Sequence, residues 1–202
     1  MYLNLLKKKK IRNFIFSSSM CVYGNFQKKV TEKDDPIPIS FYGISKLTSE
    51  QYIKFYPLPN TTKIVLRLFN VYGPGHDKKS TKHGMVGIYL NQINKNNKVI
   101  VKGKLTRFRD FIYINDVLMI IKKSMNLKNK NFNIFNVCTS KKTYIKDLIN
   151  KIFILKKLKP KISVSNGTPG DQFGIYGNNI RIRNFFKIKK FKSLKEGLDK
   201  VI

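Results

Sequence analysis

The stretch Phe41-Tyr42-Gly43-Ile44-Ser45-Lys46 sets the fold prediction, because it places a tyrosine and a lysine four residues apart where an apolar-periodic segment begins. Positions i and i+4 lie on the same face of a helix, so the phenol of Tyr42 and the ammonium of Lys46 can reach one pocket. A nearby cation favours the phenolate, and we therefore expect Lys46 to lower the pKa of Tyr42, as a general acid/base requires. By itself this spacing is a weak signal, since any helix with a surface lysine can produce it.

Strands and helices alternate on both sides of this stretch. We expect strands over residues 13–18, 63–69, 98–101, 132–138 and 161–165, and helices over residues 82–94 and 143–155. The Tyr42 helix should begin at a Ser40 cap and end before Pro57. Residues 107–117 should form a strand that leads into a helix capped by Asn115 or Asp116, and residues 181–202 a helical tail. The order strand, helix, strand predicts a parallel crossover unit and the α/β class.

Small hydroxyl side chains follow the first predicted strand, whose Phe14-Ile15-Phe16 core we expect to be fully buried. Ser17, Ser18 and Ser19 lie at its carboxyl end, which is where open α/β sheets bind ligands. A serine-rich turn that only caps the strand is an equally good interpretation at this point.

The formal charge of +30 predicts, at first sight, a binder of nucleic acid or of an anionic membrane. The lysines are spread along the whole chain together with many Asn, Ile and Phe residues, a combination typical of the codon bias of an AT-rich genome. We therefore expect no specific nucleic-acid partner and no membrane. The charge still favours an anionic small substrate, and it predicts nonspecific DNA binding that disappears as salt rises.

Few residues are suited to metal binding or to disulfides. Cys21 and Cys138 are predicted to be buried free thiols of a cytoplasmic protein, and His76 and His83 surface residues, so no metal site is expected. No apolar run approaches the length of a membrane span. The glycines at 167, 170, 174 and 177 lack the spacing and the following helix of a dinucleotide-binding turn.

Four segments in order resemble the extended short-chain dehydrogenase/reductase family. They are Ser17-Ser18-Ser19-Met20-Cys21-Val22-Tyr23-Gly24, Tyr42-Gly43-Ile44-Ser45-Lys46, Arg67-Leu68-Phe69-Asn70-Val71-Tyr72-Gly73-Pro74 and Arg109-Asp110-Phe111-Ile112-Tyr113-Ile114-Asn115-Asp116-Val117. Within that family they are most similar to the NAD-dependent nucleotide-sugar epimerases and dehydratases, and in particular to the UDP-glucose 4-epimerases. The resemblance covers residues from about 12 to 171.

The resemblance implies a mechanism and a set of site residues. Tyr42 would take the proton from a sugar hydroxyl, Lys46 would hold the nicotinamide ribose, and Ser19 would relay the proton, while hydride leaves sugar C4 and returns to its other face. Asn70 would contact the substrate diphosphate and Arg109 would clamp it. The resemblance implies that the catalytic residues are Ser19, Tyr42 and Lys46. It implies that NAD is bound by Ser17, Ser18, Tyr42, Lys46 and Phe69. A nucleotide sugar such as a UDP-hexose would be bound by Ser19, Asn70, Arg109 and Asp171.

The chain departs from the family pattern at several positions. Phe41 replaces a common proline and Tyr113 a common histidine, and neither change should matter. Thr168 stands where a second phosphate-binding arginine is frequent, which leaves the nucleotide and the sugar open.

The family also begins with a Gly-x-x-Gly-x-x-Gly turn that seats the NAD pyrophosphate, and these 202 residues contain none. We therefore expect an incomplete doubly wound, Rossmann-like parallel sheet with an unpaired apolar edge, in an inactive C-terminal portion of such an enzyme. Residues 1–73 would be the remainder of the NAD-binding domain with the catalytic residues. Residues 74–202 would be mainly a small α/β substrate domain, with one or two strands that return to the Rossmann-like sheet. A homodimer, or a separately encoded N-terminal half, is the expected partner.

Several functions remain open at this stage. A 4-epimerase is favoured over a dehydratase because Met20-Cys21 offers no acid beside the serine run. A dehydratase or oxidoreductase of the same family is the alternative within the enzymes. The alternatives from other classes are a non-enzymatic basic binding module and a subunit of a split enzyme.

Overall fold

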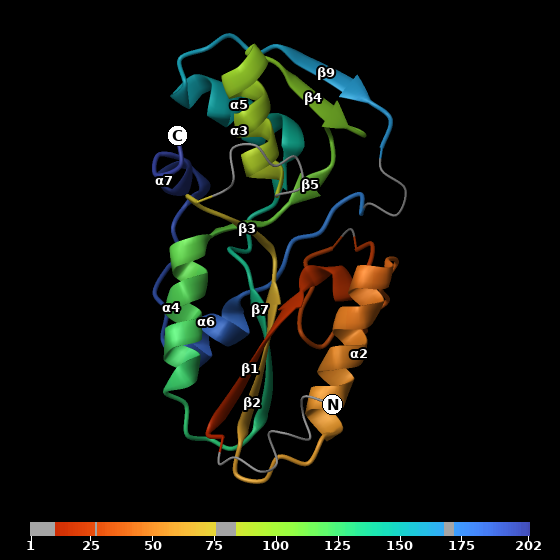
Figure 1. Ribbon diagram of the computed structural model, residues 1–202, viewed down its shortest axis with the longest axis vertical. Helices are drawn as coiled ribbons and strands as arrows, with labels where there is room; N and C mark the ends of the chain where they lie inside the picture. The colour runs from red at the N-terminus through yellow and green to blue at the C-terminus, as the bar shows by residue number, and fades with distance from the viewer. Residues whose placement is uncertain (1–10, 27, 76–83, 168–171) are drawn as a thin grey trace.

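A computed structural model describes residues 11–26, 28–75, 84–167 and 172–202. Its main sheet has three parallel strands, β1 (Asn13–Ser19), β2 (Thr62–Leu68) and β7 (Phe132–Val137), in the order β1-β2-β7 (Figure 1). The chain is therefore of the predicted α/β class with a parallel, Rossmann-like sheet.

Helix α2 (Phe41–Phe55) is the crossover between β1 and β2. It begins where Ser40 Oγ accepts a hydrogen bond from the Gly43 amide at 3.1 Å, and it ends before Pro57, as predicted. Helix α2 covers one face of the sheet, and α4 (Ile114–Met125) and α6 (Ile180–Phe186) cover the other (Figure 1). The apolar side chains of Ile64 and Leu66 pack under α4 and α6. Val65 between them is buried as well, so the continuous apolar run of β2 reflects burial on both faces of the sheet.

The carboxyl ends of the three strands lie at one edge of the sheet. Ser19 pairs with Leu68, and Leu68 pairs with Val137. The short 3-10 helix η1 (Met20–Val22) continues directly from β1 at this edge. The serine run and the segment that follows β2 are thus brought together by strand register alone.

One burial prediction for β1 is wrong. Phe14, Ile15 and Phe16 are only half-buried. Within the described part of the chain, β1 pairs with β2 on one side and with no strand on the other. This open outer edge agrees with the predicted unpaired edge of the sheet.

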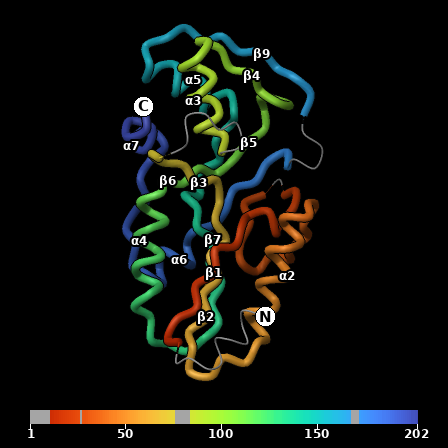
Figure 2. Tube along the Cα trace, viewed as in Figure 1, coloured from red at the N-terminus to blue at the C-terminus, as the bar shows by residue number. Residues whose placement is uncertain are grey.

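The rest of the chain forms a second, smaller group of elements. It contains α3 (Met85–Asn96), α5 (Ile145–Leu155), α7 (Leu194–Leu198), and the strand pairs β4 (Val99–Lys102) with β9 (Ile162–Ser165) and β5 (Phe108–Arg109) with β8 (Thr143–Tyr144). These elements share one apolar core. Strands β3 (Asn70–Tyr72) and β6 (Phe111–Tyr113) pair in parallel and lie between this group and the main sheet (Figure 2).

Some element ends differ from the predictions. Helix α4 begins at Ile114, so neither Asn115 nor Asp116 caps it, and the Asp116 carboxylate instead accepts the Lys192 amide at 2.8 Å. Thr143 and Tyr144 form β8 rather than the first turn of α5, because they pair with β5.

The C-terminal tail is also not one helix. Lys187 ends α6 in the left-handed conformation at a φ of 53°, and Ser193 then starts α7 with a capping box. The predicted helix over 82–94 runs instead from Met85 to Asn96, with residues 82 and 83 outside the described residues. Across the ranges that the structure describes, no helix is long and apolar enough to cross a membrane.

Candidate active site at the carboxyl ends of the strands

A cavity of about 480 Å³ lies at the carboxyl edge of the sheet, between β1, α2 and the start of α3. It brings together four of the residues predicted for the site, namely Ser19, Tyr42, Phe69 and Asn70. Its remaining lining residues are Met20, Leu68, Val71, Gly84, Met85, Val86 and Phe111. The cavity thus presents two hydroxyl groups and one side-chain amide among apolar side chains.

Ser19 lies in this cavity because β1 ends there. Its hydroxyl oxygen caps η1 by accepting a hydrogen bond from the Cys21 amide at 3.2 Å. A hydroxyl used as an acceptor still has its own hydrogen to donate, so Ser19 can hydrogen-bond a ligand oxygen. The capping function and a ligand-binding function are therefore compatible in the same side chain.

Tyr42 and Lys46 occupy one face of α2, one turn apart. The Tyr42 side chain is 54% exposed and lines the cavity. The Lys46 ammonium lies 5.6 Å from the Tyr42 ring centroid and donates a hydrogen bond to the Ser17 carbonyl oxygen at 2.8 Å. Lys46 is therefore held between the tyrosine and the serine run, beside the cavity rather than in its lining.

Gly43 explains how α2 comes so close to the serine run. A Cβ atom at this position would collide with the Cys21 carbonyl oxygen and touch Pro38. Only a residue without a side chain lets the first turn of α2 pack against η1. The glycine between Tyr42 and Ile44 is thus a requirement of the site geometry.

Two residues after β2 complete the cavity. Phe69 is buried, and the Asn70 amide nitrogen of the side chain lies 3.3 Å from the Met20 sulfur. The Asn70 backbone amide donates to the Asp110 carbonyl oxygen at 3.0 Å, which ties the start of β3 to the β5–β6 junction. The cavity is therefore supported from both groups of elements.

The other predicted site residues lie outside the cavity. Arg109 is buried, and its guanidinium donates to the carbonyl oxygens of Phe108, Gln172 and Phe173 at 2.9, 2.7 and 3.2 Å. Asp171 lies outside the described residues. The structure thus places Arg109 beneath the segment that follows residue 171.

Ser17 and Ser18 each contact α2. The Ser17 carbonyl holds Lys46, and the Ser18 hydroxyl donates to the Glu50 carboxylate at 2.5 Å. Glu50 has no role among the sequence predictions, although the i+4 spacing that connects Tyr42 to Lys46 continues to it. That continuation is the signal that could have identified it.

Asp110 is a buried carboxylate next to the cavity wall. Desolvation raises its pKa from the ordinary 3.8 to about 6, against the opposing effect of hydrogen bonds from Thr139 and Gly177. The bonds from Thr139 connect the β5–β6 junction to the loop after β7, and the bond from Gly177 connects it to the segment before α6. Asp110 thus holds neighbouring backbone segments in place by hydrogen bonds and does not line the cavity.

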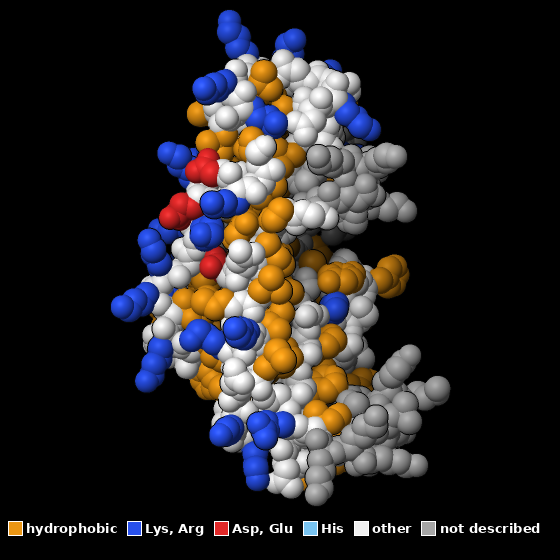
Figure 3. Space-filling view, turned by 60° about the vertical axis from the view of Figure 1, so that its left-hand side comes forward, with side chains coloured by type: hydrophobic (Ala, Val, Ile, Leu, Met, Phe, Trp, Pro, Cys, Tyr) orange, Lys and Arg blue, Asp and Glu red, His pale blue; other side chains and the backbone are white. Residues whose placement is uncertain are grey.

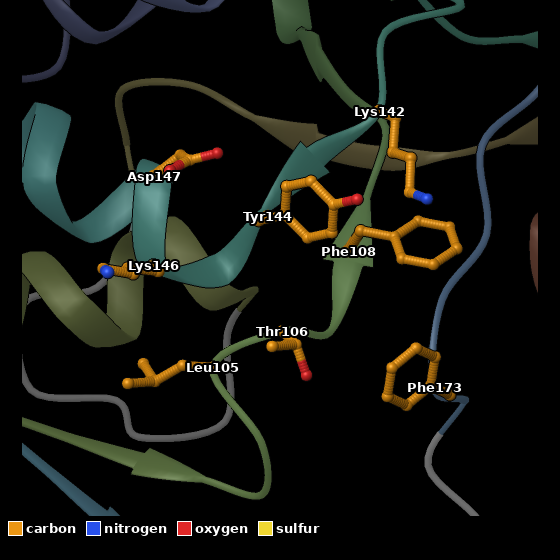
Figure 4. Close-up of a pocket in the computed structure, with 8 residues that line it drawn as sticks. All are labelled: Leu105, Thr106, Phe108, Lys142, Tyr144, Lys146, Asp147 and Phe173. Atoms are coloured by element: carbon orange, nitrogen blue, oxygen red, sulfur yellow. The ribbon is translucent and has the colours of Figure 1, made fainter.

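A second cavity of about 550 Å³ lies beside β5 and β8, and sequence reasoning missed it. Figure 4 shows Phe108, Tyr144 and Phe173 around it, with Lys146 and Asp147 on α5. The Lys142 ammonium lies 4.1 Å from the Phe108 ring centroid and 5.1 Å from that of Tyr144. Aromatic rings with nearby cations suit a planar anionic ligand. The alternation Lys142, Tyr144, Lys146 is its only sequence signal.

Neither cavity has a thiol or a metal-binding cluster among the described residues that line it. Among the described residues, no group of three or more His, Cys, Asp or Glu could hold a metal ion, and His76 and His83 lie outside those residues. Cys21 and Cys138 are free thiols, as predicted; Cys138 is buried, which raises its pKa, but Cys21 is only half-buried.

Comparison with known proteins identifies the family. The model of the NAD dependent epimerase/dehydratase family matches residues 2–138. A Methanocaldococcus jannaschii protein named "Putative UDP-glucose 4-epimerase" is 31% identical over 99% of this chain and 65% of its own length. The dTDP-4-dehydro-6-deoxyglucose reductase of Escherichia coli is 29% identical over 92% of this chain and 58% of its own length. The chain thus spans less than two thirds of these relatives.

Solved structures agree with this result. The UDP-glucose 4-epimerase of Thermotoga maritima, in complex with UDP-glucose, has a TM-score of 0.88 and 28% identity over 98% of this chain and 65% of that one. The UDP-glucuronic acid 4-epimerase of Bacillus cereus, in complex with UDP-glucuronic acid and NAD, has a TM-score of 0.86 and 25% identity over 98% and 62%. With the family model covering most of the sequence, the chain belongs to the NAD-dependent epimerase/dehydratase family.

Proposed function

We propose that this chain carries the catalytic side of an NAD-dependent nucleotide-sugar 4-epimerase. The observation that carries the proposal is the cavity at the strand ends, where Ser19, Tyr42 and Asn70 share one lining. A hydroxyl, a phenol and an amide around a space of about 480 Å³ suit a sugar ring, which presents hydroxyl groups to be hydrogen-bonded.

The residues have distinct roles in this proposal. Tyr42 Oη takes the proton from the sugar 4-hydroxyl, and Ser19 Oγ hydrogen-bonds the same oxygen. NAD supplies hydride transfer when it is bound. The residues present fit its nicotinamide ribose, because Lys46, beside the Tyr42 ring, offers ammonium hydrogens to ribose hydroxyls. Asn70, in the same lining, orients the substrate.

The cavity wall favours epimerisation over dehydration. Water elimination needs an acid beside the serine run, and none of the described residues that line the cavity is acidic. The position after Ser19 is Met20, whose side chain contacts Asn70. A dehydratase or an oxidoreductase of the same family is the second candidate within this chemistry.

The second cavity is proposed to hold the nucleotide end of the substrate. Phe111 lines the first cavity and Phe108 the second, and three residues of extended chain span about 10 Å. A diphosphate can bridge such a distance from a sugar to a base. The rings of Tyr144 and Phe173 with the Lys142 ammonium then supply stacking and charge for a UDP-like group.

Turnover is proposed to need a glycine-rich segment beyond these residues. The 202 residues contain no Gly-x-x-Gly-x-x-Gly turn for the NAD pyrophosphate. We expect the chain alone to be inactive and a separately encoded half, paired along the open edge of β1, to restore activity. Cytoplasmic location fits this substrate class.

A homodimer through α2 is proposed as well. Phe41, Tyr52 and Phe55 on this helix are 92%, 65% and 73% exposed. Such apolar exposure on one helix marks an interaction surface. Light scattering should show a dimer for the wild-type chain and a monomer for Phe55→Lys. A monomeric wild-type chain would refute the proposed dimer.

A basic binding module fits the surface less well. On the face in Figure 3, Lys and Arg side chains are spread from one end to the other, with hydrophobic and neutral side chains between them. Nucleic-acid binders instead concentrate basic residues in one patch or stripe.

The test is epimerisation of UDP-galactose, followed by proton NMR of the anomeric signals. The chain is assayed with NAD, alone and with a separately produced glycine-rich half of a relative. We expect turnover only in the combined sample, and turnover about 10²- to 10⁴-fold slower with Tyr42→Phe. Turnover by the chain alone would contradict the need for that half, and equal turnover by Tyr42→Phe would contradict the assigned site.

A further inference from the structure

A buried ion pair lies under the proposed active site, outside both cavities. Glu50 on α2 and Arg67 on β2 are 1% and 3% exposed. Arg67 Nη2 lies 2.6 Å from Glu50 Oε2, and Arg67 Nε lies 3.0 Å from Glu50 Oε1. Burying two charges costs free energy that their attraction often fails to recover. Stability alone is therefore a poor explanation for this pair.

The pair belongs to a larger hydrogen-bonded group. The Arg67 guanidinium carbon lies 4.7 Å from the Tyr23 ring centroid, and the Tyr23 hydroxyl donates to Asn136 Oδ1 at 2.7 Å. Ser18 donates its hydroxyl to Glu50 Oε1 at 2.5 Å. We call these five residues the buried cluster. It joins β1, β2, β7, α2 and the segment after η1, all of which support the first cavity.

The buried cluster acts on the same helix face as the catalytic residues. Tyr42, Lys46 and Glu50 follow one another at four-residue intervals. Lys46 is bonded to the Ser17 carbonyl and Glu50 to the Ser18 hydroxyl, so α2 is attached to the serine run at two successive positions. A shift of α2 along β1 would break both bonds together.

We propose that Glu50 and Arg67 are positioning residues, which fix α2 against the serine run so that Tyr42 and Lys46 face Ser19. The catalytic benefit of this positioning rests on the proposed function. The position of α2 against the serine run can be measured without turnover. Directional bonds from a buried carboxylate fix the position of a helix more narrowly than apolar packing, which tolerates sliding.

The test replaces the pair by apolar residues of similar size in Glu50→Leu/Arg67→Met. Removing both charges avoids an unpaired buried ion, so the variant should stay folded. Ile149→Val in the other apolar core is the matched control, because it removes buried contacts far from α2. Ser18→Ala is a second variant, which cuts only the bond between Glu50 and β1.

The first readout is the rate at which an amine-reactive ester labels Lys46, measured by mass spectrometry well below the unfolding temperature. We expect labelling several-fold faster in the double variant and in Ser18→Ala, and unchanged in Ile149→Val. The proposal is overturned if labelling of Lys46 is unchanged in the folded double variant. If the double variant does not fold, unchanged labelling in Ser18→Ala overturns it. In either case the pair has only a structural role.

The second readout uses the chain combined with NAD and a glycine-rich half. We expect kcat to fall by about 100-fold in the double variant with KM for the nucleotide sugar little changed, because misplaced groups reduce the reactive fraction of bound substrate. An unchanged kcat overturns the proposal. If the wild type shows no turnover, the proposed function fails, and the labelling experiment still decides whether the pair positions Lys46.

Discussion

The cavity at the strand ends and the cavity beside β5 and β8 are similar in size but differ in chemistry. The first, at the strand ends, has hydroxyl and amide groups among apolar side chains, and none of its described lining residues is charged. The second, beside β5 and β8, has aromatic rings, two lysines and one aspartate. The first is thus equipped to move a proton, and the second to hold an anion. Under the proposed function, the reaction would take place where both groups of elements meet, and the nucleotide would be held by the second group alone.

The largest effect is expected from Tyr42→Phe, which removes only the phenol oxygen. Turnover of the combined enzyme should fall by about 10²- to 10⁴-fold, because a general base is lost. UDP binding to the second cavity should stay unchanged, measured by calorimetry. A parallel loss of UDP binding would show that the two cavities are not independent.

Asp110 lies in the segment that the two cavities share, between Phe108 of the second cavity and Phe111 of the first. Its pKa of about 6 lies above the ordinary 3.8, so the folded state holds the proton more tightly than the unfolded chain. Its contribution to the free energy of unfolding is complete below about pH 4 and decreases by about 3 kcal/mol as pH rises to about 6.

Urea unfolding at several pH values checks this prediction, with Asp110→Asn as the reference. The advantage of the wild type over the variant should shrink as pH rises through this window. Parallel pH dependence of the two proteins would show that Asp110 does not titrate there.

Gly43→Ala should damage the first cavity alone. The added methyl group meets the Cys21 carbonyl, and such overpacking costs about 1–3 kcal/mol and displaces α2. We expect lower thermal stability and slower turnover. Ser49→Ala on the same helix is the control; if both variants behave alike, the close approach at Gly43 is unimportant.

The smallest effect is expected from Lys142→Ala in the second cavity. Loss of a cation near two rings should weaken UDP binding by about twofold to fivefold, with kcat unchanged. Lys151→Ala removes the same charge from an exposed position of α5 outside the cavity. Equal weakening in both variants would indicate a general charge effect.

Local patterns predicted much of the fold and part of the site. The Ser40 cap, the extent of α2 and the parallel crossover follow from capping and periodicity near Tyr42. Ser19 and Asn70 share one cavity because the carboxyl ends of parallel strands lie at the same edge of a sheet. The two-domain division at residue 73 and the individual roles of the site residues stay predictions.

The failures have a common cause in tertiary pairing. Thr143 and Tyr144 become a strand only because β5 lies beside them, and Asp116 is drawn to the Lys192 amide instead of capping α4. Glu50 is buried because Arg67 is there to pair with it, and no local pattern contains that partner. The second cavity likewise joins segments that are distant in sequence.

The most direct test of the central claim follows one deuterium atom. The chain, NAD and a separately produced glycine-rich half are incubated with UDP-glucose deuterated at C4, and the product is analysed by NMR and mass spectrometry. We expect UDP-galactose that retains the deuterium at C4, because hydride leaves and returns at the same carbon. A dehydrated product, or deuterium lost from C4, would contradict it.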